Sequence, residues 1–136
     1  MDAFDADVLI YAADLDHQLG NRVLELFRPD TRPAGVGSTL LLTEVLVPRT
    51  DGRADEIDEL GRLLERLDLR TVDRRIAEAA AILRGKYRLK TADAVHLATA
   101  LDAGADRFIT NNARDFPKTI TEIDITYPTD LPDPVT

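Results

Sequence analysis

Short apolar segments with strand character alternate with longer amphipathic segments along the chain. The strand candidates are residues 3–5, 34–37, 69–72, 107–110 and 124–127. In the stretches between them, apolar residues recur every three or four positions, which is the spacing of one helix face. These helical stretches are residues 8–13, 16–27, 38–46, 55–67, 73–87 and 92–103. Strands that alternate with helices form a parallel sheet covered on both faces. The predicted fold class is therefore α/β, a three-layer α/β/α sandwich with a short central parallel sheet.

Length and composition fit one domain. The chain has 136 residues, of which 44% are hydrophobic, enough to bury a core. We expect a single domain over residues 1–136, with the Pro-rich segment 128–136 as a tail on the surface. Residues 1–7 contain no basic segment, and no apolar run approaches the roughly 20 residues that span a membrane. The sequence therefore predicts a soluble, cytoplasmic protein.

Cysteine content and charge exclude several kinds of chemistry. The chain has no cysteine and two histidines. These counts exclude a disulfide scaffold, Cys-ligated zinc, an iron–sulfur cluster, thiol catalysis and a His-rich metal site. A bound cation would be held mainly by oxygen, which favours Mg²⁺ or Mn²⁺. With a net charge of −8, the chain does not attract nucleic acid by its overall field, so any such contact is local or helped by a metal ion.

Acidic and amide side chains follow the predicted strands, at the ends where parallel sheets bind ligands. They come from four separate segments of the chain: Asp5 and Asp7, Glu44, Asp93, and Asn112 with Asp115. Clustered carboxylates repel one another, and a divalent cation relieves that repulsion. A cation held in this way activates water and neutralises the charge of a phosphodiester under attack.

Four short blocks contain these acidic and amide residues. Residues 4–12 read Phe-Asp-Ala-Asp-Val-Leu-Ile-Tyr-Ala, and residues 38–46 read Ser-Thr-Leu-Leu-Leu-Thr-Glu-Val-Leu. Residues 89–100 contain Asp-Ala-Val-His-Leu-Ala-Thr-Ala, and residues 108–116 read Phe-Ile-Thr-Asn-Asn-Ala-Arg-Asp-Phe. In this order the blocks resemble D-x-[NSD]-V-L-I-Y, S-x(5)-E-V-L, D-A-x-h-A-A-x-A and T-x-[ND]-x-x-D-F of the PIN domain. The resemblance is greatest to the VapC-type toxin ribonucleases of toxin–antitoxin pairs.

This resemblance implies a metal-dependent endoribonuclease that hydrolyses RNA phosphodiester bonds. It assigns Asp5, Glu44 and Asp93 as ligands of Mg²⁺ or Mn²⁺. Asn112 stands at a fourth metal position where many members have Asp, and Asp115 is the other candidate there. The catalytic residues expected are Asp5, Glu44, Asp93 and Asp115. The partners implied are an RNA substrate, a small antitoxin that holds the enzyme inactive by covering the groove of its active site, and a second copy of the chain in a homodimer.

A basic run over residues 84–90 leads directly into the third block. Lys86, Arg88 and Lys90 are the predicted substrate-binding residues, as contacts for RNA phosphate. The alternative is a basic helix C-terminus that the helix dipole favours. Residues 49–53, with an arginine at each end, are candidates for the opposite wall of the site.

Three further residues have more than one interpretation. Asp7 is either an acid that supports the metal ligands or the N-cap of the helix over 8–13, and the cap is favoured. His96 follows Asp93 by three residues on the same helix face, where it touches substrate, holds a carboxylate or packs in the core. Packing is favoured for His96, and a solvated helix position is expected for His17.

Two other functions fit parts of the sequence. Residues 5–8 match the D-x-D-x-[TV] nucleophile motif of haloacid-dehalogenase-type phosphatases. That class also needs a downstream lysine with a later acidic pair; Lys118 lacks such a pair, and the chain is short for the fold. The second alternative is a non-catalytic PIN-like module that binds RNA or a protein, which Asn112 favours because it lowers the charge of the acid cluster.

Overall fold

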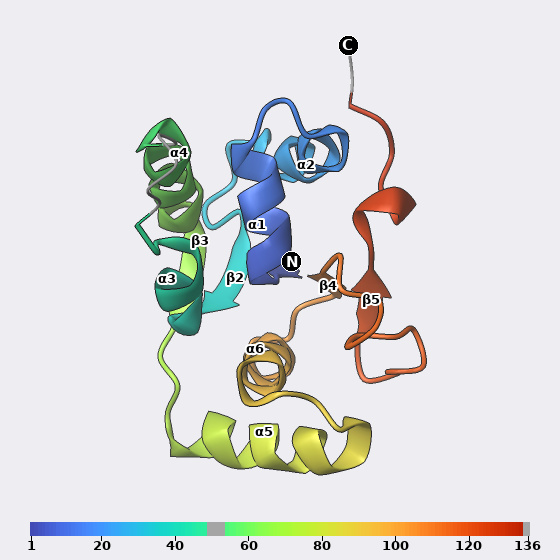
Figure 1. The fold of residues 1–136 in the computed structure, drawn as a ribbon. Helices are drawn as coiled ribbons and strands as arrows, with labels where there is room; N and C mark the ends of the chain where they lie inside the picture. The colour runs from blue at the N-terminus through green and yellow to red at the C-terminus, as the bar shows by residue number, and fades with distance from the viewer. Residues whose placement is uncertain (49–53, 135–136) are drawn as a thin grey trace.

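A computed structural model of the chain describes residues 1–48 and 54–134 and is drawn as a ribbon in Figure 1. Within these residues, five parallel strands form one sheet in the order β3-β2-β1-β4-β5. The strands are β1 (Asp2–Phe4), β2 (Gly35–Ser38), β3 (Leu67–Arg70), β4 (Arg107–Ile109) and β5 (Asp124–Thr126). The predicted α/β class and short parallel sheet are therefore confirmed.

Helices cover both faces of this sheet. They are α1 (Ala6–Ala13), α2 (Gln18–Leu24), α3 (Leu40–Val45), α4 (Ala54–Glu65), α5 (Arg74–Tyr87) and α6 (Thr91–Asp102), with short 3₁₀ helices η1 (Glu25–Phe27) and η2 (Pro128–Asp130). None of the helices in the described part of the chain is long and apolar enough to cross a membrane. One buried cluster joins the sheet to α5 and α6, and a second joins its opposite face to α1, α2, α3 and α4. Figure 1 shows α5 and α6 below the strands, so the three-layer arrangement is confirmed.

Neighbouring residues of each central strand supply the two cores in turn. In β1, Ala3 belongs to the α5–α6 core and Phe4 to the other core, and Phe108 and Ile109 of β4 divide in the same way. Successive side chains of a strand point to opposite faces of a sheet. Three residues are therefore enough for β1 to anchor both helical layers. Burial on both faces also explains why these strands are short apolar runs in the sequence.

The side chain of the residue before the first turn caps the N-terminus of α1 and of α2. α1 begins at Ala6, earlier than predicted, because the Asp5 side chain accepts a hydrogen bond from Ala6 N and caps the helix. The prediction that Asp7 is this cap is therefore wrong. α2 begins directly after His17, whose Nδ1 accepts a hydrogen bond from Gly20 N at 3.1 Å. His17 is thus a capping residue and not simply a solvated one.

The boundary between α4 and β3 differs from the predicted one, because strand pairing sets where β3 begins. Leu67 pairs with Gly35 in the parallel register of β2 and β3. Leu67 therefore begins β3, which replaces the predicted strand 69–72, and α4 ends at Glu65 within the predicted helix 55–67. The other four strands lie within one residue of their predicted bounds.

The order of the strands places a crevice at the carboxyl ends of β1 and β4. The chain begins in the centre of the sheet, adds β2 and β3 on one side, and then adds β4 and β5 on the other. Phe4 and Ile109 pair at the ends of the two central strands, and Asp5 N donates to the Ile109 carbonyl at 2.9 Å. Ligands bind at such a switch point in parallel sheets. Asp5 and Thr110 are the first residues beyond it.

The proline-rich tail packs against the α1–α4 side of the molecule as far as residue 134. Leu131 is buried in the core of that side. Arg22 of α2 donates to the Leu131 carbonyl at 3.0 Å and pairs with Asp133 at 2.6 Å. Residues 135–136 lie outside the described residues.

Candidate active site

Asp5 is the buried acid at the centre of the crevice. Its Oδ1 accepts from Ala6 N at 2.8 Å, and its Oδ2 accepts from the Thr110 hydroxyl at 2.7 Å. Asp5 is 6% exposed, and this burial raises the pKa of its carboxyl because the charged form loses hydration. Thr110 is a contact that sequence analysis did not single out. Its signal was a polar residue directly after the apolar strand β4.

Asp7 faces the loop that follows β4 from the first turn of α1. Its Oδ2 accepts a hydrogen bond from Asn111 N at 3.1 Å. Its Oδ1 is buried and has no hydrogen-bond partner among the described residues. Burial, followed by the nearby charge of Asp5, raises the pKa of Asp7 from 3.8 to about 7. Asp7 is therefore an acid within reach of the cluster.

Asp93 lies in the first turn of α6, close enough to three other acids to feel their charges. Its carboxylate makes no hydrogen bond or ion pair within residues 1–48 and 54–134. Burial, followed by the charges of Asp5 and Asp115, raises the pKa of Asp93 from 3.8 to about 6, and Glu44 adds to the same effect. The structure thus brings together Asp5, Glu44, Asp93 and Asp115, the four acids predicted as the catalytic set.

Glu44 reaches the cluster from the exposed face of α3. Its side chain is 36% exposed, and its Oε1 contacts Nε2 of His96. His96 lies on α6, three residues after Asp93, and is 3% exposed. The favoured interpretation of His96 as a packed residue and the alternative that it holds a carboxylate are thus both realised.

Asn112 and Asp115 hold each other in the turn after β4. Asn112 Oδ1 accepts from Asp115 N at 3.1 Å, and Asn112 Nδ2 donates to Asp115 Oδ2 at 2.9 Å. Both polar atoms of the Asn112 amide are therefore used within the turn. Asp115 Oδ2 also lies 3.7 Å from Nζ of Lys90, on the segment between α5 and α6.

The three predicted substrate-binding residues do not share one environment. Lys90 adjoins Asp115, and its side chain is 80% exposed. Arg88 ends α5 in the left-handed conformation, with φ 57°, and its exposed side chain has no hydrogen-bond or ion-pair partner among the described residues. Lys86 instead pairs with Glu122 at 3.1 Å, and that hydrogen bond raises the Lys86 pKa.

A further cation stands in the turn that contains Asp115. Arg114 is exposed, precedes Asp115 in the turn, and makes no hydrogen bond or ion pair from its side chain within the described part of the chain. Sequence analysis missed Arg114 because it stands alone, outside the basic run. The candidate segment 49–53 lies outside the described residues.

The chemistry of the cluster fits a divalent cation. Across residues 1–48 and 54–134, no three acidic or histidine side chains are already arranged as a set of metal ligands. Asp5, Glu44 and Asp115 each use an oxygen to accept from a protein donor. Asp93 and the Oδ1 of Asp7 have no such donor among the described residues. Their negative charge, left without a partner, fits a hard cation that prefers oxygen ligands.

Comparison with known proteins gives a family and solved structures with a related fold. A family model for the PIN domain matches residues 3–120. A chain of a toxin–antitoxin complex from Klebsiella pneumoniae is 27% identical, with a TM-score of 0.71 over 94% of this chain and 98% of that one. A chain of the crystal structure of VapBC2 from Rickettsia felis, bound to a DNA fragment from their promoter, has a similar fold. Its identity is 17% and its TM-score 0.70, over 93% of this chain and 97% of that one. A search of curated proteins found no match.

We expect the metal-free protein to lose stability as the pH rises from about 4 to about 7. The pKa values of Asp7 and Asp93 are about 7 and about 6 in the folded protein, against the usual 3.8. In this interval the folded state holds protons that the unfolded state has released, so the free energy of unfolding is highest below it and falls through it. Thermal unfolding in EDTA from pH 4 to pH 8 measures the decline.

Asp93→Asn should flatten this decline and raise the metal-free Tm at pH 8 by a few degrees, because it removes a charge without removing a hydrogen bond. Asp58→Asn is the matched control, since it removes the same charge from the exposed face of α4. A wild-type Tm that stays constant over this range would contradict the repulsion among the acids.

Proposed function

Because the chain belongs to the PIN-domain family, we propose that it is a divalent-metal-dependent endoribonuclease and the toxin of a toxin–antitoxin pair. The observation that carries the proposal is the meeting of carboxylates from four segments at the carboxyl ends of β1 and β4, with the pKa values of Asp7 and Asp93 raised. Such a concentration of negative charge can hold a cation, and the bound cation then stabilises the negative charge of a phosphodiester under attack. The similarity to a chain of a toxin–antitoxin complex supports the toxin role.

Four acids are proposed to hold Mg²⁺ or Mn²⁺. Asp5 and Asp93 are the primary ligands, and Glu44 binds directly or through water. Asp115 supplies the fourth carboxylate in preference to Asn112, because the Asn112 oxygen already accepts from Asp115 N. When bound, the cation supplies a Lewis acid for the attacking water and the scissile phosphate.

The side chains around the cation have separate tasks. Glu44 orients the attacking water and accepts its proton, because its carboxylate is partly exposed whereas Asp5 is buried. Thr110 fixes Asp5 through its hydroxyl, and Asp7 fixes the loop after β4 through Asn111 N. The ligand-bearing segments are thereby tied to one another before a substrate arrives.

RNA phosphates are proposed to contact Arg88, Lys90 and Arg114. All three side chains are exposed, and Lys90 and Arg114 flank the Asp115 turn. Lys86 is left out of this set because Glu122 already neutralises it. These cations give local attraction for RNA in a chain whose net charge is −8.

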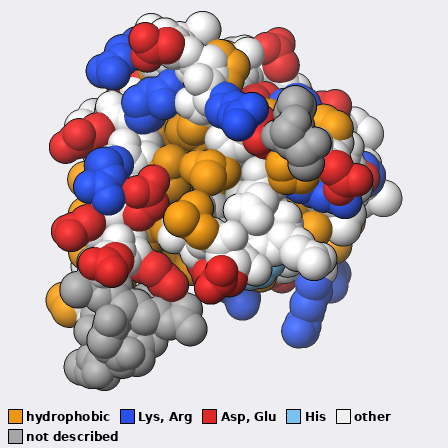
Figure 2. All heavy atoms as spheres, turned by 90° about the horizontal axis from the view of Figure 1, so that it is seen from above, with side chains coloured by type: hydrophobic (Ala, Val, Ile, Leu, Met, Phe, Trp, Pro, Cys, Tyr) orange, Lys and Arg blue, Asp and Glu red, His pale blue; other side chains and the backbone are white. Residues whose placement is uncertain are grey.

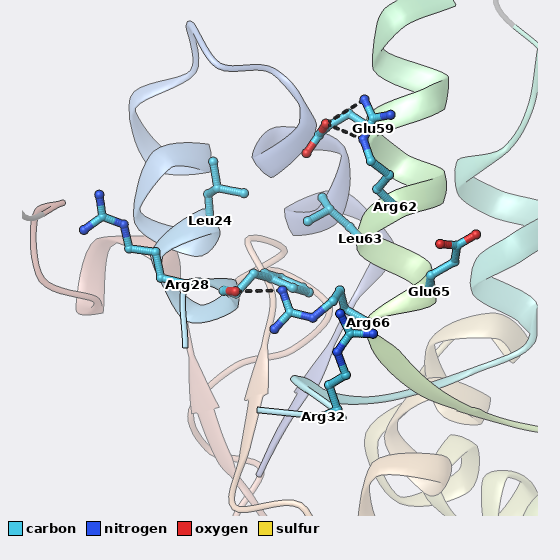
Figure 3. A pocket seen from close by; sticks show the side chains of 9 residues that line it. Leu24, Arg28, Arg32, Glu59, Arg62, Leu63, Glu65 and Arg66 are labelled. Atoms are coloured by element: carbon cyan, nitrogen blue, oxygen red, sulfur yellow. Dashed lines mark hydrogen bonds and ion pairs between the residues drawn. The ribbon is translucent and has the colours of Figure 1, made fainter. Parts of the chain in front are cut away.

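A groove on the α1–α4 side is the proposed docking surface for the antitoxin. It lies between α2, η1 and α4 and has a volume of about 420 Å³. Figure 2 shows an apolar hollow on this side of the molecule with charged side chains around it. Leu24, Phe27 and Leu63 are its apolar lining residues, and in Figure 3 Leu24 and Leu63 project into the space between the helices.

The rim of this groove is rich in arginine. Its charged residues are Arg28, Arg32, Arg62 and Arg66, with Glu59 and Glu65. Arg66 donates to the carbonyls of Phe27 and Pro29, at 2.9 and 2.8 Å, and its Nε is buried without a partner among the described residues. Four arginines and two glutamates line the groove, and Arg28, Arg32 and Arg62 also pair with Glu25, Asp30 and Glu59. An antitoxin segment with acidic residues beside an apolar face complements it.

Other expectations stand beside this proposal. The family match gives no support to the phosphatase alternative. The non-catalytic module remains the alternative that a cleavage assay decides. The homodimer, the single domain and the cytoplasmic location remain predictions.

Asp93→Asn should reduce RNA cleavage by roughly 100-fold or more while the protein stays folded. The change is nearly isosteric and removes one of the two proposed primary ligands. Cleavage of a labelled RNA by purified protein is measured in Mg²⁺, in Mn²⁺ and in excess EDTA, with circular dichroism as the check on folding. Asp58→Asn should cleave like the wild type. Wild-type cleavage that persists in EDTA would refute the metal mechanism, and binding without cleavage would favour the non-catalytic module.

The triple variant Arg88→Ala, Lys90→Ala and Arg114→Ala should bind RNA more weakly and with a smaller salt dependence. Each lost phosphate contact lowers the slope of log K against log salt by about 0.7 for single strands. Lys86→Ala is the matched control and should bind like the wild type. Binding by a catalytically inactive background is followed over a salt series, and equal effects of both changes would contradict the assignment.

Charge reversal at Arg28 and Arg32 should weaken antitoxin binding by about tenfold or more and reduce its salt dependence. Both side chains are exposed and lie 3.5 and 3.7 Å from Glu25 and Asp30, so their loss should not affect folding. The binding partner to be tested is the product of any short reading frame that is found directly upstream of the gene. Arg74→Glu with Arg75→Glu, on α5, is the control and should bind normally.

A further inference from the structure

We propose that His96 is a positioning residue that holds the Glu44 carboxylate toward the acid cluster and thereby sets the metal affinity of the site. This inference rests on the proposed function, because it concerns the same cation. It adds a residue whose side chain touches neither metal nor RNA.

The position of Glu44 explains why a partner is needed. α3 is six residues long, and its buried residues are Leu41 and Val45. Glu44 lies on the exposed face, where a glutamate side chain samples several rotamers. His96 Nε2 contacts Glu44 Oε1 across 52 positions of sequence and is the partner that fixes this side chain among the described residues. The contact selects the rotamer that faces Asp93 and Asp5.

The burial of His96 excludes a direct role. Its side chain is 1% exposed, so the ring cannot contact RNA. Its Nε2 is occupied by Glu44, and its Nδ1 is buried with no hydrogen-bond partner in the described part of the chain. Nε2 is therefore occupied by Glu44, and burial closes off Nδ1.

The same contacts assign the hydrogen on the ring. A carboxylate only accepts, so Nε2 carries the hydrogen that it donates to Glu44. Nδ1 then keeps its lone pair, because a buried N–H without an acceptor is the more costly arrangement. Glu44 accepts through Oε1, and its Oε2 remains for a cation or a water. Hydrogen-bonded partners of this kind orient metal-binding carboxylates, and their loss costs about 10–100-fold in metal affinity.

Two substitutions of His96 separate the hydrogen bond from the packing. His96→Leu keeps an apolar side chain of similar size but removes the donor. His96→Gln keeps an N–H donor near the place of Nε2. Thr99→Val is the matched control, since Thr99 is buried on the same helix and its hydroxyl donates to the Val95 carbonyl at 2.8 Å, away from Glu44.

Mn²⁺ binding to the full chain, measured by isothermal titration calorimetry, is the first readout. His96→Leu should weaken it about 10–100-fold, whereas His96→Gln should stay within a few-fold of the wild type and Thr99→Val should match it. Thermal unfolding of each variant in EDTA shows that it is folded. Unchanged Mn²⁺ affinity in folded His96→Leu, or an equal loss in His96→Leu and His96→Gln, would overturn the inference.

The imidazole ¹H–¹⁵N spectrum of the metal-free protein is the second readout and does not depend on catalysis. His96 should be in the Nε2–H form, and Glu44→Gln should shift its Nε2 resonance. An Nδ1–H form, or a resonance that ignores Glu44→Gln, would also overturn the inference. A wild type that binds no Mn²⁺ would count against the proposed function, whereas normal wild-type binding with an unaffected His96→Leu would count against His96 alone.

Discussion

The Asp5 carboxylate joins the parts of the molecule on which the site depends. It ends β1, caps α1 through Ala6 N, and accepts from the Thr110 hydroxyl beyond β4. A buried carboxylate requires such donors, because it loses its hydration on folding. The Thr110 bond also ties the segments that follow the two central strands together, beside the acids from α3, α6 and the turn after β4. One side chain therefore serves as a helix cap, a link between strands and a member of the acid cluster.

The acid cluster opposes the stability of the fold that presents it. Burial raises the pKa values of Asp5, Asp7 and Asp93, so each of them resists ionisation in the folded chain. Hydrogen bonds from Thr110 and from the backbone offset part of this cost at Asp5 and Asp7. Asp93 has no such donor among the described residues, and its charge is the one most directly left for a cation. The remaining repulsion is the physical reason to expect that a metal ion both stabilises the protein and activates it.

Cationic side chains occur in two separate groups on this acidic chain. Lys90 lies beside Asp115 at the carboxyl ends of the strands, Arg114 directly precedes Asp115, and Arg88 stands two residues before Lys90. The arginine-rimmed groove instead adjoins the segments that enter β2 and β3, since Arg66 directly precedes β3. In the proposed function, an antitoxin held in the groove is therefore anchored at the opposite edge of the sheet from the proposed metal ligands. The proposed RNA and antitoxin surfaces therefore use different cations.

The sequence by itself determined the order of strands and helices, the α/β class and the four segments that carry the acids. Apolar periodicity within each segment encodes these features, because it depends on neighbours a few positions apart. Only the tertiary structure decided which side chains meet: Asp5 and not Asp7 caps α1, Lys86 pairs with Glu122, and Glu44 contacts His96. It also decided where β3 begins, because Leu67 pairs with Gly35. These contacts join residues from different elements, and the packing of two helical layers on one sheet brings them together, which no local pattern specifies.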